Sequence, residues 1–294
     1  MDISMLFKYF PIKLTEALKC TDNEKIQEIR IIAERNCVLL KGGKLCETNV
    51  HISAKDVTTI VEMMCRGSLY AMQSSLSNGF FTIEGGHRVG VCGKVSCENG
   101  KITHMSDISA LCVRISREII GAADNIMEYI ECKDRVYNTL IISPPGSGKT
   151  TILRDIARNI GNRKKVCIVD ERSEIAACTG GVAQNDVGKF TCVLDRAPKT
   201  EGMRILLRTM APDVIITDET GGENEEQAIY EIINCGIKII TTIHGYNERD
   251  ILRRQYFGKL MEMGIFERII ILSSRKGPAT IEKIITDGRV IYRG

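Results

Sequence analysis

The sequence predicts an α/β protein with a smaller α+β domain over residues 1–118, a linker over 119–135, and a larger domain over 136–294 whose sheet is mostly parallel. Two observations support this prediction. From residue 136 onward, short apolar runs typical of buried strands alternate with amphipathic stretches of helical periodicity, which is the pattern of a doubly wound sheet. Before residue 118, short strand-like runs and tight glycine turns dominate instead.

The expected elements of the first domain are short. A strand pair is predicted around the turn at residues 34–36. A helix is predicted over 51–64, with Ser53 as its cap, because apolar residues recur there at helical spacing. The other expectations, in chain order, are a helix over 69–76, a turn-rich β-meander over 80–96, a strand over 110–115, and an amphipathic linking segment over 118–133.

In the second domain, strands and helices are expected to alternate. The predicted parallel strands are residues 139–143, 165–170, 214–217 and 238–243. The predicted helices are residues 149–160, 200–210 and 223–235. The tail predicts antiparallel strands at 268–272, 279–286 and 289–293, with Asp287 and Gly288 as a hairpin turn.

The composition is that of a soluble globular protein, with 44% hydrophobic and 26% charged residues and a formal net charge of +3. No apolar run reaches the roughly 20 residues that a membrane-spanning helix needs. The first residues also lack the basic and apolar segments of a secretory signal, so a cytoplasmic protein is expected. The twelve cysteines are scattered without a Cys-x-x-Cys pair, which favours reduced thiols over a zinc cluster.

The most informative segment is Ser-Pro-Pro-Gly-Ser-Gly-Lys-Thr at residues 143–150, between a predicted buried strand and a predicted helix start. This order predicts a phosphate-binding loop, because backbone N–H groups of the loop and the helix N-terminus point at phosphate oxygens. The glycines allow the sharp turn, although Ser143 stands where the pattern has Gly. Lys149 is expected on the β- and γ-phosphates and the Thr150 hydroxyl on Mg²⁺. The expected nucleotide-binding residues of this loop are Ser143, Pro144, Pro145, Gly146, Ser147, Gly148, Lys149, Thr150 and Thr151.

Two acids follow a second predicted strand. Asp218 and Glu219 come directly after the apolar run 214–217, at the end of the sheet where open α/β sheets place ligands. Asp218 is expected to assist the Mg²⁺ site, and Glu219 to be the base that polarises the attacking water. The alternative, a strand followed by a solvated acidic turn, is disfavoured by the phosphate loop upstream.

Polar residues also end two other predicted strands. Asp170, Glu171 and Glu174 form an acidic cluster that is expected to hold Mg²⁺ through water or to orient the lytic water, with Glu174 assigned to catalysis. The alternative is a charged surface loop. His244 is expected to sense the γ-phosphate and pass that information to a moving domain, and a merely structural histidine is the alternative.

Arginines matter in multimeric ATPases, because one from a neighbouring subunit can stabilise charge on the transferring phosphate. Arg88 lies inside the glycine-dense segment Gly-Gly-His-Arg-Val-Gly, and we expect it to contact nucleotide. The other candidates, each of which can equally be a solvated surface residue, are Arg114, Arg117, Arg204 and Arg208.

With these elements in order, the second domain resembles the ATPases of type II and type IV secretion and of pilus motors. That family has a phosphate loop, an acidic box, a Walker B strand and a His box, which correspond here to residues 143–150, 170–174, 214–219 and 242–244. Two departures stand out. The family usually ends its Walker B strand with Gly-Glu, where this chain has Asp218-Glu219, and Gly221-Gly222 replace the arginine that normally follows. The resemblance implies a P-loop NTPase domain of the RecA-like class and a ring-forming, hexameric Mg²⁺-dependent ATPase.

The first domain extends the resemblance to nearly the full chain, from about residue 25 to 294. Segments 68–71, 78–93 and 193–199 resemble the stage III sporulation protein AA family. That resemblance implies an ATPase on the mother-cell side of endospore-forming bacteria. It would be cytoplasmic but peripheral to a membrane complex, docked on a membrane protein of the channel that joins mother cell and forespore.

The expected cofactors are therefore ATP and Mg²⁺, and the expected partners are other copies of the chain and the channel protein, without DNA. The alternative is a nucleic-acid motor or nucleotide-dependent binding protein of the P-loop class. The near-neutral charge and the lack of Trp, with only eight Tyr and seven Phe, count against it. A third hypothesis is a non-hydrolysing ring that uses ATP only to assemble.

Overall fold

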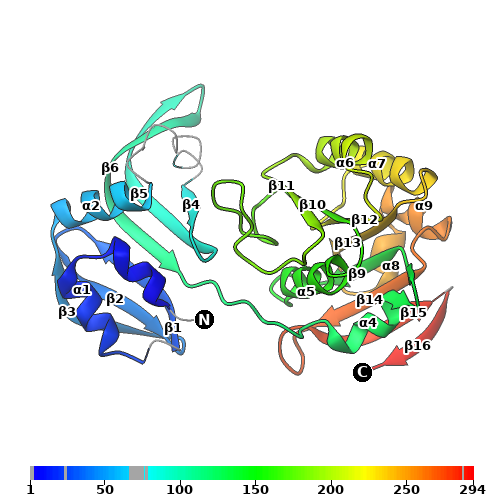
Figure 1. The fold of residues 1–294 in the computed structure, drawn as a ribbon, viewed down its shortest axis with the longest axis horizontal. Helices are drawn as coiled ribbons and strands as arrows, with labels where there is room; N and C mark the ends of the chain where they lie inside the picture. Colours follow the sequence, from blue (N-terminus) through cyan, green and yellow to red (C-terminus); the bar gives the residue numbers. More distant parts are fainter. Residues whose placement is uncertain (1–2, 23–24, 66–75, 77–78, 287) are drawn as a thin grey trace. The chain divides into compact units, whose positions relative to one another are not determined.

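The computed structural model describes residues 3–22, 25–65, 76, 79–286 and 288–294 (Figure 1). The chain divides into two units, Met1–Glu118 and Ile119–Gly294. The helix expected over 69–76 lies, apart from its last residue, outside the described residues, as does Asp287 of the expected hairpin turn.

The first unit is built on an antiparallel sheet with the strand order β3-β2-β1-β6-β5-β4 (Figure 1). Its strands are β1 (Ile26–Ile32), β2 (Arg35–Lys41), β3 (Lys44–Ile52), β4 (Phe80–Ile83), β5 (His87–Glu98) and β6 (Lys101–Arg114). Its described helices are the 3₁₀-helix η1 (Ile3–Tyr9), α1 (Ile12–Lys19) and α2 (Ala54–Met64).

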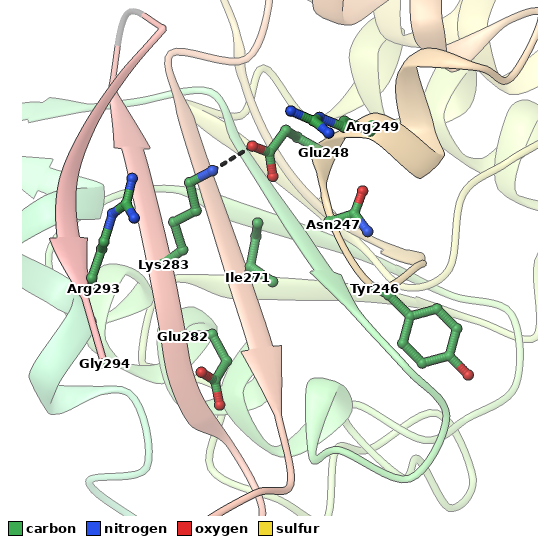
Figure 2. A pocket seen from close by; sticks show the side chains of 9 residues that line it. All are labelled: Tyr246, Asn247, Glu248, Arg249, Ile271, Glu282, Lys283, Arg293 and Gly294. Carbon is green, nitrogen blue, oxygen red and sulfur yellow. Dashed lines mark hydrogen bonds and ion pairs between the residues drawn. The ribbon is translucent and has the colours of Figure 1, made fainter.

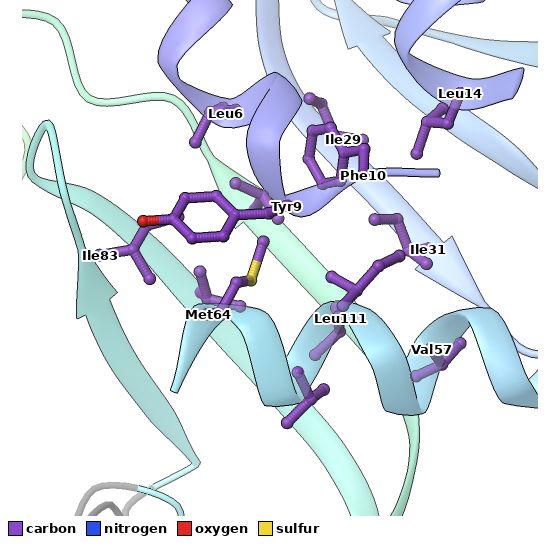
Figure 3. Close-up of a cluster of buried hydrophobic side chains, with 14 of the residues drawn as sticks. Leu6, Tyr9, Phe10, Leu14, Ile29, Ile31, Val57, Met64, Ile83 and Leu111 are labelled. Atoms are coloured by element: carbon purple, nitrogen blue, oxygen red, sulfur yellow. The ribbon is translucent and has the colours of Figure 1, made fainter. Parts of the chain in front are cut away.

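These helices cover one face of that sheet. Leu6 of η1, Leu14 of α1 and Val57 of α2 are buried in one apolar core with Ile29 and Ile31 of β1 (Figure 3). The α2 helix begins where the sequence predicts, because Ser53 caps it. The Ser53 Oγ accepts from the Asp56 N–H at 3.2 Å, and the Asp56 carboxylate accepts from the Ser53 N–H at 2.8 Å.

The hairpin of β5 and β6 is much longer than expected. The predicted meander of short strands over 80–96 and the separate strand over 110–115 are wrong in extent, because β5 runs to Glu98 and β6 begins at Lys101. The turn between them is Asn99 and Gly100, with φ of 51° and 75°. Positive φ at both central residues is the geometry of a type I′ hairpin turn, which matches the twist of the flanking strands.

Glu84, Gly85 and Gly86 make the tight turn between β4 and β5, and the following His87 and Arg88 begin β5. Gly85 and Gly86 have φ of 82° and 73°, and a Cβ at Gly85 would lie 2.2 Å from the sulfur of Met5, so only glycine fits there. The next residue, His87, is buried, and its Nδ1 accepts from the Ser116 N–H at 3.1 Å. Burial lowers the pKa of His87 to about 4, so its ring is neutral at physiological pH.

The second unit contains a larger sheet with the order β11-β10-β12-β13-β9-β14-β15-β16, parallel from β11 through β14 and antiparallel beyond (Figure 1). Its strands are β9 (Thr139–Ser143), β10 (Val166–Asp170), β11 (Thr191–Asp195), β12 (Val214–Thr217), β13 (Lys238–His244), β14 (Arg268–Ser273), β15 (Thr280–Thr286) and β16 (Arg289–Arg293). A separate pair is formed by β7 (Glu131–Cys132) and β8 (Arg135–Val136).

Helices cover both faces of this sheet. Alternate residues of β9 point to opposite faces, so Ile141 joins one apolar core while Leu140 and Ile142 join another. The first core contains α4 (Asp124–Ile130) and α5 (Lys149–Gly161), and the second contains α6 (Lys199–Thr209), α7 (Glu223–Asn234), α8 (Glu248–Leu252) and α9 (Phe257–Glu262). This is the doubly wound arrangement that the alternating pattern predicts.

The edges of this sheet add two findings to the sequence prediction. An edge strand, β11, pairs in parallel with β10, although no strand was expected at 191–195. The three tail strands are antiparallel to one another as expected, and β14 also pairs in parallel with β9. Residues 119–135 lie within this unit, where Ala123, Ile126 and Ile130 are buried in its core.

Candidate functional site

The predicted phosphate loop connects β9 to α5. Gly146 and Gly148 have φ of 73° and 85°, which side chains with a Cβ rarely adopt. Gly148 is the residue before α5, and a Cβ there would lie 3.3 Å from the backbone nitrogen of Ala279. The Ala279 N–H donates to the Ser147 carbonyl at 2.8 Å, so the β14–β15 connection braces the loop. The N-terminus of a thirteen-residue helix thus opens directly after a glycine turn, as an anion site requires.

Lys149 is the first residue of α5, and its side chain is buried. Its Nζ donates to the Pro144 carbonyl at 3.2 Å and lies 3.0 Å from Nδ1 of His244. Burial lowers the pKa of Lys149, and the nearby Glu219 charge opposes that shift. The structure therefore brings the phosphate-loop lysine and the histidine that ends β13 into contact across adjacent strands.

Glu219 lies beyond the end of β12 and contacts the same histidine. Its Oε1 is 2.7 Å from Nε2 of His244, and its Oε2 is 3.2 Å from the guanidinium of Arg172. Its N–H donates to the Thr242 Oγ1 at 2.9 Å, and the Thr220 N–H donates to the Thr242 carbonyl at 2.8 Å. These bonds hold Glu219 at a φ of 21°, a conformation that residues other than glycine rarely adopt.

Asp218 is only 3% exposed and carries the most informative pKa shift of the site. Burial, opposed by the charge of Lys199 and aided by the neighbouring charges of Asp170, Glu174 and Glu219, raises the pKa of Asp218 to about 6. The Oδ1 of Asp218 lies 3.6 Å from the Lys199 Nζ and accepts no hydrogen bond within the described part of the chain.

The three acids of the cluster after β10, Asp170, Glu171 and Glu174, make different interactions. Asp170 is fully buried, and its carboxylate accepts the backbone N–H groups of Glu174, Ile175 and Ala176 at 2.9, 3.0 and 2.9 Å. The carboxylate of Asp170 therefore anchors the following loop. Glu171 binds the buried Lys199 at 2.7 Å. The charge of Glu174 contributes to the raised pKa of Asp218.

Two cations of the site were missed by sequence reasoning, Arg172 and Lys199. Arg172 stands two residues beyond β10, at the same carboxyl edge as the predicted acids, and that position was an available signal. Lys199 begins α6, where periodicity alone assigns a lysine to solvent, yet it is 5% exposed. Burial lowers the pKa of Lys199, but the hydrogen bond with Glu171 and the charge of Asp218 more than compensate, so the net shift is upward.

The other predicted arginines have partners of their own. Arg88 lies in the first unit, where its guanidinium stacks 3.6 Å from the ring centroid of Phe80. Arg204 on α6 binds Glu231 on α7 at 2.8 and 2.9 Å. Three further contacts complete the set: Arg114 pairs with Glu28 at 3.3 Å, Arg117 donates to the Ile26 carbonyl at 2.9 Å, and Arg208 lies 3.8 Å from Glu201.

The residues present fit a magnesium ion that is held partly by phosphate and water. Among the described residues, no group of three or more His, Cys, Asp and Glu side chains could hold a metal alone. Mg²⁺ characteristically uses one or two protein oxygens with substrate phosphates and retained waters. Thr150, the second residue of α5, supplies a hydroxyl at the phosphate loop, and Asp218 offers a buried carboxylate oxygen without a hydrogen-bond donor in the described structure.

The same unit also has a cavity that does not include the predicted phosphate-binding and magnesium-binding residues. A cavity of about 530 Å³ opens between the loop after β13 and strands β14 to β16, and Lys283 pairs with Glu248 across it (Figure 2). Neither Lys149 nor Asp218 nor Glu219 lines it, so we do not assign phosphate binding to this cavity.

Comparison with known proteins identifies the family. The model for sporulation stage III, protein AA matches residues 9–291. The chain belongs to this family. Stage III sporulation protein AA of Bacillus subtilis is 38% identical over 276 residues, covering 92% of this chain and 90% of that protein. The Arabidopsis thaliana protein SEEDLING PLASTID DEVELOPMENT 1 is 32% identical over 152 residues, which is 50% of this chain and 21% of that protein.

Solved structures confirm the predicted fold. The ATPase DotB of Legionella pneumophila matches with a TM-score of 0.60 at 17% identity, covering 94% of this chain and 81% of that chain. The pilus retraction motor PilT with bound ADP matches with a TM-score of 0.62 at 16% identity, covering 88% of this chain and 76% of that chain. At these identities the likeness shows that the chain shares the fold of these two proteins. In the described part of the chain, no helix is both long and apolar enough to span a membrane.

Proposed function

We propose that this member of the stage III sporulation protein AA family hydrolyses ATP with Mg²⁺. The single observation that carries the proposal is the contact chain from Lys149 through His244 to Glu219, at distances of 3.0 and 2.7 Å. It joins the lysine of a phosphate loop to a carboxylate at the end of a neighbouring strand. A phosphate-binding cation and a base for the attacking water thus share one site.

In the proposed reaction, water attacks the γ-phosphorus, the bond to the bridging oxygen breaks, and ADP and phosphate leave. The loop from Ser143 to Thr151 binds the phosphates through its N–H groups, and Lys149 neutralises their charge. Glu219 orients and polarises the water. Bound Mg²⁺, held by the Thr150 hydroxyl with help from Asp218, would offset charge on the β- and γ-phosphates.

His244 and Glu174 take supporting roles in this proposal. His244 touches both Lys149 and Glu219, so phosphate that draws Lys149 away changes the surroundings of Glu219. Glu174, in the loop after β10, would hydrogen-bond to water at the metal site, and its charge acts on Asp218. Arg88 remains a predicted nucleotide contact, supplied by its own or a neighbouring subunit.

At the cellular level, we infer a ring of identical subunits, a hexamer, in which an N-terminal domain over 1–118 precedes an ATPase domain over 136–294. The segment 119–135, predicted as a linker, packs into the second unit. Family membership and the secretion-ATPase fold support this inference. The ring would work in the cytoplasm of the mother cell, peripheral to a membrane protein of the channel to the forespore, and would energise export or channel function.

The test is steady-state ATP hydrolysis by purified protein with Mg²⁺ and with EDTA, over a range of protein concentrations, beside Lys149→Ala. We expect Mg²⁺-dependent activity that rises more than linearly with concentration and is lost in Lys149→Ala. Activity that Lys149→Ala retains would refute the site. DNA-stimulated, salt-sensitive hydrolysis would instead favour a nucleic-acid motor.

A further inference from the structure

Arg172 forms the free end of the contact chain at the proposed site. The chain runs from Lys149 through His244 and Glu219 to Arg172, with successive distances of 3.0, 2.7 and 3.2 Å. It therefore has a cation at each end and the Glu219 carboxylate between His244 and Arg172. Phosphate that binds Lys149 competes directly with the contact that Lys149 makes with His244.

The backbone at Arg172 is fixed. On one side, the fully buried Asp170 ends β10, and its carboxylate holds three backbone N–H groups of the segment that follows. The same segment is held from α5, where Arg154 donates to the carbonyls of Glu174 and Ile175 at 2.6 and 2.7 Å. Any change of partner by Arg172 therefore comes from its side chain.

That side chain has the freedom to change partner. The Arg172 side chain is 56% exposed, and the side chain of its acidic partner, Glu219, is 26% exposed. Lys199, by contrast, is 5% exposed and lies between Glu171 and Asp218. An ion pair as exposed as Arg172–Glu219 contributes little to stability, so a stronger anion can displace the carboxylate.

We propose that Arg172 acts within its own subunit as a γ-phosphate ligand, pairing with Glu219 when the phosphate site is empty and leaving it for the phosphate when ATP binds. The inference rests on the proposed ATPase function. A guanidinium suits this exchange because it binds carboxylate and phosphate oxygens with the same planar array of donors. The exchange also leaves Glu219 free to act on water only when a γ-phosphate is present, which couples base availability to ATP.

The test is equilibrium binding of a non-hydrolysable ATP analogue and of ADP, each with Mg²⁺, to the full chain. Arg172→Gln should weaken the analogue at least tenfold and ADP less than twofold, with Arg172→Lys between wild type and Arg172→Gln. Arg163→Gln serves as the matched control, because the Arg163 side chain is 58% exposed, belongs to the same unit and also pairs with a glutamate, Glu131. Equal losses for both nucleotides, or no loss, would overturn the proposal.

Glu219→Gln should change the affinity for the ATP analogue in the opposite direction to Arg172→Gln. Removing the carboxylate frees Arg172 in advance, so the analogue should bind up to about fivefold more tightly. That gain should vanish in the double variant Arg172→Gln/Glu219→Gln, and a gain that persists there would contradict the exchange. Lys149→Ala, measured alongside, separates the two proposals. If Lys149→Ala binds both nucleotides like wild type, the proposed function fails. If Lys149→Ala loses binding but Arg172→Gln binds both nucleotides like wild type, only the inference about Arg172 fails.

Discussion

Replacing Asp218 with Asn should stabilise the nucleotide-free, metal-free protein, and the gain should depend on pH. The pKa of this buried carboxyl is raised from 3.8 to about 6. Between these values the unfolded chain releases the proton while the folded chain keeps it, so wild-type stability falls as pH rises through this range and is constant above it. About two pKa units at 1.36 kcal/mol each give a loss of about 3 kcal/mol that Asp218→Asn avoids.

Differential scanning calorimetry of the apo protein measures this effect. For a unit of this size, about 3 kcal/mol corresponds to roughly 6–12 °C in Tm, so we expect that increase for Asp218→Asn at pH 7.5 and about half of it at pH 5. Asp134→Asn, an exposed aspartate of the same unit, should change Tm little at either pH. A variant less stable than wild type at pH 7.5, or an equal gain at both pH values, would refute the reasoning.

Three further predictions follow from the same site. Lys199→Met removes a buried cation that faces two carboxylates and should cost about 3–5 kcal/mol, seen as a Tm lower by roughly 10 °C or more; an unchanged Tm would be inconsistent with the pairing. Asp170→Ala removes the acceptor of three backbone N–H groups, so limited proteolysis should cut the loop after β10 much faster than in wild type, and equal cutting rates would count against the anchor. Gly148→Ala places a Cβ 3.3 Å from the Ala279 nitrogen at φ 85° and should weaken Mg²⁺·ATP binding at least tenfold, whereas Gly181→Ala, at φ 79° in open space, should leave binding unchanged.

The parts of the site that local sequence predicts are those built from one strand and the residues after it. The run 143–150 combines a buried strand, a glycine turn and a helix start, so its geometry follows from consecutive residues. Asp218, Glu219 and His244 follow their strands in the same way, and the parallel register places all of them at one edge. The structure brings Lys149, Glu219 and His244 together as that argument requires.

The missed residues depend on contacts between distant segments. Lys199 is 28 residues from Glu171, and nothing in the periodicity of α6 distinguishes its buried lysine from an exposed one. Arg172 is recognised as part of the site only through its contact with Glu219, which follows a different strand, β12. The contacts of Asp170 could not be foreseen for another reason. In a sequence, a carboxylate that binds backbone N–H groups of a loop looks the same as one that assists a metal.

Two errors in the fold have different causes. The outer part of the β5–β6 hairpin is mostly exposed, so it lacks the apolar alternation by which strands are recognised. Its Asn99-Gly100 turn was nevertheless a strong hairpin signal that was overlooked. The helices η1 and α1 are short, and the N-cap residue of α1, Pro11, makes no side-chain capping hydrogen bond, so neither offered a clear start signal.

The most direct test of the central claim separates ATP binding from ATP cleavage at Glu219. In a single-turnover experiment with excess protein, Mg²⁺ and γ-labelled ATP, wild type should release labelled phosphate. Glu219→Gln should bind the nucleotide at least as tightly and cleave it at least a hundredfold more slowly. Glu219→Gln that cleaves ATP at the wild-type rate would contradict the assignment of Glu219 as the base and, with it, the site described here.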